Sequence, residues 1–442
     1  MAPLDIKAGI KTVLPIFVSL AGSGFLAFLT QILLGHSLTV EEFGIVSTAV
    51  SVGVIMAAAI GFGMPSVWLL IFGQKGWEAF PWVWRSLTFL MVWGPIVLAL
   101  SWIGLLWLFD DARLLNTIGW LQAMVVMQVM VELLTAKLQL EARYLALSIW
   151  QILPHLGRLI VAATVYCSAA SSVDLVAQGY CAISLALIVA SGIGLLSLTP
   201  SKMQLSGHTT DNPYRSERPS QSPSYRELFN LAWPYAGTAA LVMLYGRVDI
   251  VLLGSIVSPT AAGQFSVAAA FLLVAFLVPQ AMYQKFLLPK IHRWFYSDWQ
   301  KFLSVYRLGC AVMTLLGIAC TGATYLWGQP LVNLFFGEKY KESGEILSLL
   351  SVCIVLRFVS SSFESALMSG DYRKHRLYCQ VVSTIIGVSS AYILIVQYGL
   401  HGAIISRIVT ELTLLVGYSY ASSRYVLGAK AWSGWSLKFN QG

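Results

Sequence analysis

The chain has 442 residues, of which 57% are hydrophobic and only 11% are charged. Because soluble globular domains carry about 25% charged residues, this composition excludes an ordinary soluble fold and predicts an all-α polytopic membrane protein. Lys and Arg outnumber Asp and Glu by 28 to 20, which gives a net charge of +8. In so apolar a chain we interpret this excess as a signal of membrane topology and not of nucleic-acid binding.

Runs of apolar residues predict about twelve transmembrane helices, since a helix of about 20 residues crosses the hydrocarbon core of a bilayer. In chain order, the predicted spans cover residues 12–35, 44–73, 84–108, 117–136, 146–168, 173–198, 228–254, 261–284, 303–326, 346–369, 376–397 and 400–422.

Residues 199–227, between the sixth and seventh predicted spans, are rich in Ser, Pro, Asn and Arg and predict a linker with no core of its own. The linker separates an N-terminal six-helix bundle at 1–198 from a C-terminal six-helix bundle at 228–425, which is followed by a tail at 426–442. The six cysteines all lie in apolar stretches, without a C-x-x-C pair or metal-spaced histidines. We therefore expect neither a metal site nor a cofactor.

The basic residues of the predicted loops lie almost entirely on one side of the membrane. Twenty lie on the side of the N-terminus, whereas three, Arg113, Lys339 and Lys341, lie on the other. A missed span would invert every later loop and destroy this asymmetry. The positive-inside rule therefore predicts that both termini, the linker and the tail are cytoplasmic.

An internal repeat relates the two halves. The segment LLGHSLTVEEFGIVSTA from Leu33 recurs as LLGSIVSPTAAGQFSVA from Leu252, an offset of 219 residues. A chance match between Gly- and Ala-rich membrane segments is the alternative. Since each half has an even number of spans, a true repeat predicts a pseudo-twofold axis along the membrane normal, a central cavity and alternating access. The matched pairs are Gly35 and Gly254, Gly44 and Gly263, Ser47 and Ser266, and Ala49 and Ala268.

Three segments carry a family resemblance: LLGHSLTVEEFG, YGRVDIVLLGSIVSPTAAGQFSVAAA and NLFFGEKYKESGEIL. With them the chain resembles the polysaccharide transporter (Wzx-type O-antigen flippase) family. That family belongs to the multidrug/oligosaccharidyl-lipid/polysaccharide exporter superfamily, which also includes the MATE drug exporters and the lipid II flippase. Asp249 matches an Asp that the family commonly places before an L-G pair, whereas His36 stands where the family often has an arginine.

The resemblance implies a flippase that moves an undecaprenyl-pyrophosphate-linked oligosaccharide, an O-antigen or exopolysaccharide repeat unit, across the bacterial inner membrane. It also implies H⁺ or Na⁺ as a coupling ion, contact with membrane lipids, and a polysaccharide polymerase or chain-length regulator as a partner. No nucleic-acid partner is expected.

Ionisable side chains within the spans are functional candidates, because each costs at least about 2.5–3.5 kcal/mol at bilayer depth. Arg158 is the strongest candidate, since it shares one helical face with Gln151 and His155 and has no acidic residue on its own helix. Glu132 on the neighbouring span is the alternative partner that would neutralise it. The nine ionisable residues are Glu132, Arg158, Arg247, Asp249, Arg307, Arg357, Glu364, Arg407 and Glu411.

We predict two roles for these residues. The cations suit a pyrophosphate, because a guanidinium binds phosphate oxygens bidentately and stays charged at low hydration. The carboxylates suit ion coupling or charge pairing; Arg407 and Glu411 in particular are spaced for a pair within one helix. The predicted substrate-binding residues are Arg158, Arg247, Arg357, Arg407 and His155, and the predicted ion-coupling or charge-pairing residues are Glu132, Asp249, Glu364 and Glu411.

Two other functions compete with the flippase. A MATE-like exporter of small cations would need a net negative cavity, whereas five Arg and four acids leave the spans at a net charge of +1. A polymerase or ligase of polysaccharide assembly depends on a large external loop with catalytic residues. The longest predicted external loop, 327–345, contains no histidine.

Overall fold

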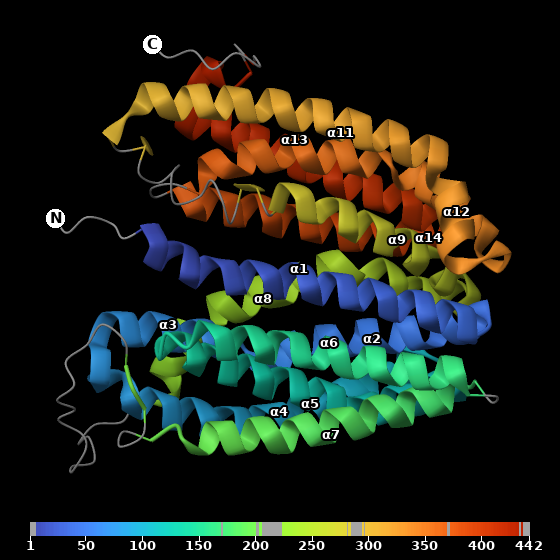
Figure 1. Cartoon of the computed structure of the whole chain (residues 1–442), viewed down its shortest axis with the longest axis horizontal. Helices are drawn as coiled ribbons and strands as arrows, with labels where there is room; N and C mark the ends of the chain where they lie inside the picture. The colour runs from blue at the N-terminus through green and yellow to red at the C-terminus, as the bar shows by residue number, and fades with distance from the viewer. Residues whose placement is uncertain are drawn as a thin grey trace. The chain divides into compact units, whose positions relative to one another are not determined.

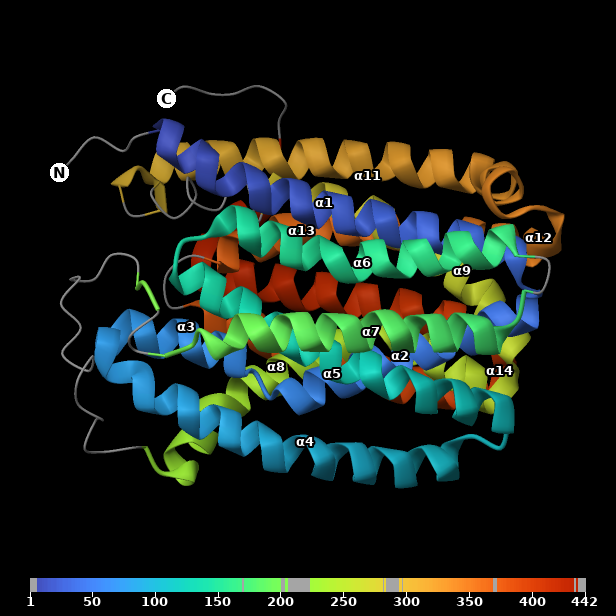
Figure 2. The same cartoon turned by 60° about the horizontal axis from the view of Figure 1, so that its bottom comes forward.

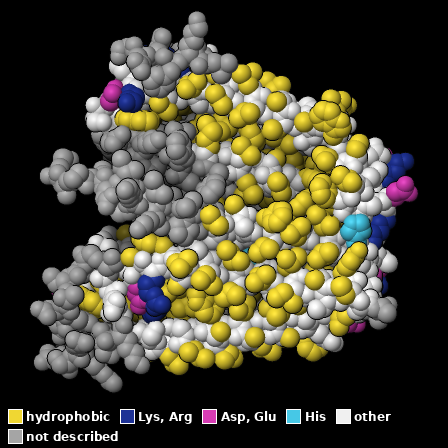
Figure 3. Space-filling view, in the orientation of Figure 1, with side chains coloured by type: hydrophobic (Ala, Val, Ile, Leu, Met, Phe, Trp, Pro, Cys, Tyr) yellow, Lys and Arg dark blue, Asp and Glu magenta, His cyan; other side chains and the backbone are white. Residues whose placement is uncertain are grey.

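The computed structural model describes most of the chain, as an assembly of helices. It describes residues 6–435 apart from 169–170, 200–202, 206–222, 281, 284–293, 296, 369–371 and 433–434. Over these residues every regular element is helical, because only a helix satisfies its own backbone polar groups in lipid without a closed barrel. Figure 3 shows hydrophobic side chains along the lengths of the helices and charged ones near the helix ends.

The first seven helices precede the linker, and the others follow it (Figure 1). The first group is α1 (Ile6–Ser37), α2 (Val40–Gly61), α3 (Met64–Lys75), α4 (Phe80–Leu108), α5 (Ala112–Leu140), α6 (Tyr144–Cys167) and α7 (Val173–Leu196). The second is α8 (Tyr225–Leu252), α9 (Pro259–Gln280), α11 (Trp299–Phe336), α12 (Lys341–Leu350), α13 (Val352–Leu367) and α14 (Arg373–Ala421). Short helical turns are η1 (Gly76–Ala79), η2 (Leu253–Val257), η4 (Glu338–Tyr340), η6 (Ser422–Leu427) and η7 (Gly428–Ala431).

Within the described residues, nine helical stretches are long and apolar enough to cross a membrane, or ten when α12 and α13 count as one bent span. Two stretches are too long for a single crossing. Val40–Leu108 has 69 residues and turns at Gly76, and Lys374–Leu427 has 54 residues and turns at Gly399. Both glycines have positive φ, which other residues rarely adopt. With α12 and α13 counted as one span, dividing each of these two stretches at its glycine turns ten spans into twelve, the number that the sequence predicts.

Some element boundaries differ from the predicted ones. Helix α11 continues to Phe336 and ends at Gly337, where φ is 85°. The predicted external loop 327–345 is therefore mostly helical, because the helix continues beyond residue 326 through the mixed polar and apolar segment Trp327–Phe336. The predicted span 346–369 is also not one straight helix, because α12 and α13 meet at a bend of 41° next to Ser351.

The described contacts divide the chain into two compact units. The first comprises Met1–Leu38 and Ile45–Arg247, and the second comprises Thr39–Gly44 and Val248–Gly442. Helices α2 and α8 thus each contribute residues to both units. The bundles at 1–198 and 228–425 stay a prediction, since these units have other boundaries.

Each unit is built by close packing of helix pairs. In the first unit, α6 lies along α1 and α5 lies along α7 (Figures 1 and 2). In the second unit, α13 packs against α11 and α14. Glycines allow the closest approaches: a Cβ on Gly179 of α7 would lie 2.6 Å from a methyl carbon of Val161 on α6. This small-residue packing is typical of membrane helices, where lipid supplies no hydrophobic driving force between helices.

Candidate functional site

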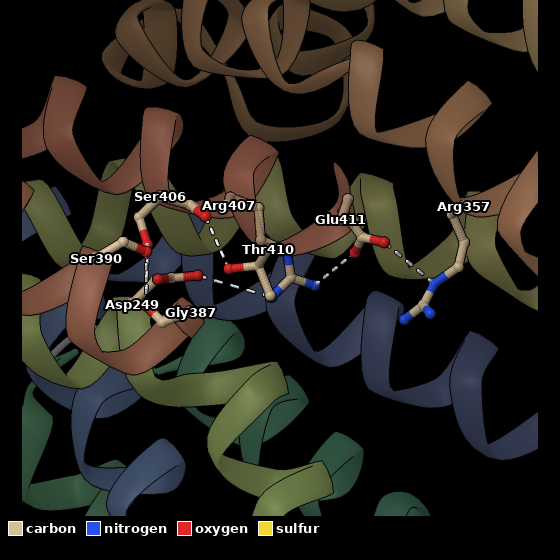
Figure 4. Close-up of polar contacts among 8 residues, drawn as sticks. All are labelled: Asp249, Arg357, Gly387, Ser390, Ser406, Arg407, Thr410 and Glu411. Carbon is tan, nitrogen blue, oxygen red and sulfur yellow. Dashed lines mark hydrogen bonds and ion pairs between the residues drawn. The ribbon is translucent and has the colours of Figure 1, made fainter. Parts of the chain in front are cut away.

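Four charged side chains form one cluster inside the second unit (Figure 4). Arg407 on α14 lies between two carboxylates: its Nη1 is 3.6 Å from Oδ2 of Asp249 on α8, and its Nη2 is 3.8 Å from Oε1 of Glu411. Glu411 also faces Arg357 on α13, whose Nε is 3.6 Å from Oε2 of Glu411. Asp249, Arg407 and Glu411 are buried. We call these four residues the charge cluster; its two arginines and two carboxylates balance.

Small polar residues of α14 fix the position of Arg407 (Figure 4). The hydroxyl of Ser406 donates to the carbonyl of Gly387 at 3.2 Å and lies 3.1 Å from the hydroxyl of Ser390. A Cβ on Gly387 would lie 2.7 Å from Oγ1 of Thr410. The segments of α14 before and after Gly399 therefore pack closely against each other next to Arg407.

Arg357 is the most accessible cation of the charge cluster. Its side chain is 20% exposed, against 9% for Arg407, and its guanidinium lies 5.1 Å from the ring centre of Phe276 on α9. Glu364 does not pair with Arg357. It instead binds Arg376 at the start of α14, with Nη2 and Nε 2.6 and 2.7 Å from Oε1 of Glu364.

The first unit contains the polar face predicted on α6. Nε of Arg158 donates to the carbonyl oxygen of Pro154 at 3.3 Å, and His155 precedes it by one turn. Gln151 accepts a 2.8 Å hydrogen bond from the hydroxyl of Ser19 on α1. Within the described residues, no carboxylate lies within 4.0 Å of the Arg158 guanidinium.

Glu132 on α5 therefore does not neutralise Arg158, contrary to the alternative that the sequence left open. Its Oε1 instead accepts a 3.4 Å hydrogen bond from Gln128, one turn earlier on the same helix. Glu132 is exposed, although it belongs to a predicted span. In the part of the chain that the structure describes, no Lys or Arg lies at ion-pair distance from it.

Two further predicted residues lie on α8 and α11. Arg247 is half-buried at the last position of the first unit, and Arg307 lies on α11 in the second. Among the described residues, no set of three His, Cys, Asp or Glu side chains is arranged to hold a metal ion. All six cysteines are free thiols.

Sequence reasoning missed two features near these residues. It did not find the partner of Glu364; the basic run Arg373–Arg376, which follows the same predicted span, was the available signal. It also missed the break between α2 and α3, where Phe62 and Gly63 have φ of 46° and 66°. The dipeptide Phe-Gly inside an apolar run gives only a weak signal for such a break.

The fold is that of the transporters of the multidrug/oligosaccharidyl-lipid/polysaccharide (MOP) superfamily. An inward-facing MATE-family transporter of this superfamily matches with a TM-score of 0.71 and 17% identity, over 91% of this chain and 94% of that one. The lipid II flippase MurJ, in an inward closed conformation, matches with a TM-score of 0.69 and 11% identity, over 92% and 87%. The chain thus shares the fold of these two proteins, and identities this low show the fold alone.

Residues 33–345 match the model of the polysaccharide biosynthesis protein family, and the chain belongs to this family. It is 26% identical to the capsular polysaccharide biosynthesis protein CapF of Staphylococcus aureus, over 45% of this chain and 50% of that protein. It is 24% identical to a putative O-antigen transporter of Shigella dysenteriae, over 42% and 46%. The chain spans about half the length of these curated relatives. The predicted family membership is confirmed.

Proposed function

We propose that the protein is a flippase for an anionic lipid-linked oligosaccharide, namely an undecaprenyl-pyrophosphate-linked repeat unit of an O-antigen or exopolysaccharide. It takes the unit from the cytoplasmic leaflet of the bacterial inner membrane and presents it outside by alternating access. Family membership, the relatives named for capsule synthesis and O-antigen transport, and the fold shared with a lipid II flippase support this proposal.

The observation that carries the proposal is Arg158. An arginine at membrane depth needs a partner, because its charge is costly there. No carboxylate among the described residues pairs with Arg158, and a backbone carbonyl is its hydrogen-bond partner. A pyrophosphate would supply the missing negative charge and accept two hydrogen bonds from the planar guanidinium. We assign Arg158 to the pyrophosphate and the neighbouring His155 to the same group.

The other proposed cations differ in how firmly carboxylates hold them. Arg407 contacts two carboxylates at once, so we assign it mainly to holding α8 against α14. Arg357 is more exposed and pairs with Glu411, and we propose it as the second cation for the substrate. Arg247 is the remaining arginine that we propose for substrate binding.

Among the acids, Glu132 is the best candidate for the coupling ion, H⁺ or Na⁺. It is exposed, and within the described residues it has an amide as partner and no cation. Asp249, Glu364 and Glu411 each contact an arginine, and we assign them to charge pairing first.

The test is a translocation assay in spheroplasts or vesicles with variants of Arg158. We expect Arg158→Gln to lower movement of the lipid-linked oligosaccharide at least about tenfold without loss of membrane insertion, since it removes the charge that binds phosphate. Arg158→Lys keeps the positive charge but lacks the planar guanidinium that binds two phosphate oxygens at once, so we expect partial activity. Arg113→Gln is the control, because Arg113 is exposed and pairs with Asp111. Full activity of Arg158→Gln would remove this assignment.

A MATE-like exporter of small cations is the second candidate, and Glu132 is the observation that favours it. An exposed carboxylate without a basic partner among the described residues suits a cationic substrate as well as a coupling ion. Drug resistance of an overexpressing strain separates the two functions. Resistance that Glu132→Gln abolishes, together with unchanged oligosaccharide movement in a deletion strain, would favour the exporter.

The proposed partners follow from the product. A repeat unit delivered to the outer leaflet must be joined to other units, so a polysaccharide polymerase or chain-length regulator is the partner class that we propose. We also propose that membrane lipids contact the hydrophobic side chains that Figure 3 shows on the surface of the molecule.

A further inference from the structure

The internal repeat brings two equivalent glycines together. Gly44 on α2 and Gly263 on α9 are matched positions of the repeat, and both belong to the second unit. A Cβ on Gly263 would lie 3.2 Å from the backbone nitrogen and 3.3 Å from Cα of Gly44. The two helices therefore cross with backbone against backbone at this point.

The crossing is symmetric in its details. A Cβ on Gly44 would overlap the carbonyl oxygen of Pro259, and a Cβ on Gly263 would overlap the carbonyl oxygen of Val40. Val40 and Pro259 are themselves separated by the repeat offset and precede each glycine by four residues. Each glycine thus faces the first turn of the other helix, as expected when two copies of one motif meet on a twofold axis.

Further contacts surround the crossing, and these do not follow the repeat. The ring of Phe43 meets Tyr340 edge to face at 5.8 Å between centroids, and Tyr340 is completely buried. Gln264 donates to the carbonyl of Lys339 at 3.2 Å and accepts from the backbone of Ser343 at 3.1 Å. These residues hold the turn that contains Tyr340 over the start of α2.

Helix α2 begins in the second unit and continues in the first. Thr39–Gly44 belong to the second unit, whereas Ile45 and the rest of α2 belong to the first. Because α2 is continuous here, movement of its later part relative to the second unit must either bend α2 or separate Gly44 from Gly263.

We propose that the Gly44–Gly263 crossing is a reversible latch at the predicted external end, and that it must open for the substrate to leave. The proposal rests on the proposed transport function. The two glycines have no side chains to interlock, so opening separates bare backbone there and the edge-to-face rings of Phe43 and Tyr340. The Tyr340 hydroxyl is buried without a hydrogen-bond partner among the described residues, which limits the stability of the closed latch.

The first experiment closes the latch covalently. In a full-length variant with all six native cysteines replaced, Phe43→Cys and Tyr340→Cys are combined and joined by oxidation or by a short bis-thiol reagent. We expect oligosaccharide movement to fall at least tenfold on cross-linking and to recover when an oxidised pair is reduced. Unchanged movement after complete cross-linking would overturn the latch.

The second experiment prevents closure and does not depend on the substrate. Gly44→Ala and Gly263→Ala are each combined with Tyr340→Cys and treated from outside with a membrane-impermeant maleimide. We expect the thiol introduced at position 340 to react at least tenfold faster than in the native-glycine background. Gly104→Ala on α4 is the matched control, because no atom lies within 4 Å of its added Cβ. Equal labelling in all three alanine backgrounds would refute the proposal.

The two readouts separate this proposal from the flippase assignment. If the native chain moves no lipid-linked oligosaccharide, the proposed function fails, and labelling of the Tyr340→Cys variants still decides on the latch. If the native chain is active but neither cross-linking nor the alanine variants change movement or labelling, the latch alone fails.

Discussion

At the scale of single residues, the charge cluster shows how a membrane protein places ions at low cost. Arg407 touches two carboxylates and Glu411 touches two arginines, so no charge of the cluster stands alone. Removing one partner from such a network is costly, because the remaining charge is then uncompensated at low dielectric. The cluster should therefore contribute to stability whether or not it binds substrate.

Glu411→Gln tests this contribution. The substitution removes the carboxylate that faces Arg357 and one of the two carboxylates that contact Arg407. We expect a loss of roughly 3–5 kcal/mol in unfolding free energy, the range for breaking a buried pair, measured as a lower midpoint of thermal unfolding in detergent.

Glu364→Gln is the matched control for that measurement. Its partner Arg376 has a side chain 34% exposed, so the pair is better solvated than the charge cluster. We expect the free energy of unfolding to fall by about 1 kcal/mol or less, the range for solvent-exposed ion pairs. Equal losses for the two variants would contradict the distinction between a buried network and a peripheral pair.

The sequence predicted some of these pairs and not others for a geometric reason. The pair of Arg407 and Glu411 follows from helical spacing alone. The contact between Arg357 and Glu411 joins α13 to α14, and no local pattern encodes which faces of two helices meet. Helical periodicity likewise places Arg158 on a polar face of its own helix. Whether Glu132 reaches Arg158 depends on which faces α5 and α6 turn toward each other, which no local pattern encodes.

At the scale of elements, the interrupted helices depend on side chains from their neighbours. At the bend between α12 and α13, the hydroxyl of Thr321 on α11 donates to the carbonyl of Ser351 at 3.1 Å and accepts from the nitrogen of Val355 at 3.2 Å. At the break between α2 and α3, the indole nitrogen of Trp93 donates to the carbonyl of Ala59 at 3.0 Å. Both contacts satisfy backbone groups near a break, where lipid offers no partner.

Thr321→Val should weaken the bend without changing side-chain shape. The substitution removes both hydrogen bonds and leaves the carbonyl of Ser351 and the N–H of Val355 without this partner. We therefore expect the free energy of unfolding to fall by about 1–3 kcal/mol. Thermal unfolding in detergent measures it. Thr314→Val is the control on the same helix, because that hydroxyl bonds to its own preceding turn, at Cys310. A loss no larger than that of the control would show that the bend needs no support from α11.

These interruptions mark the limit of prediction at the element scale. The turn at Gly399 falls in the predicted gap between the last two spans, because Gly399 breaks the apolar run after Tyr398. The bend at Ser351 has no Gly or Pro, and its cause lies on another helix. Apolar length therefore predicts how many times the chain crosses, whereas the bends depend on tertiary hydrogen bonds.

At the scale of the whole molecule, the internal repeat and the asymmetry of basic residues predict the same membrane topology. Two halves with an even number of spans keep the same orientation, so matched glycines of the repeat can meet at one end. The same even count predicts that the linker and both termini lie on one side, the side predicted to carry twenty of the basic residues. The two arguments use different residues and reach the same topology.

Cysteine labelling in intact cells tests this topology. In the cysteine-free background, we expect Lys341→Cys to react with an impermeant maleimide from outside, because Lys341 is one of three basic residues on the predicted external side. Lys75→Cys at the end of α3 should react only after the cells are permeabilised. Labelling in the reverse order would invert the predicted topology and would place the Gly44–Gly263 latch at the cytoplasmic end, where it would control substrate entry instead of release.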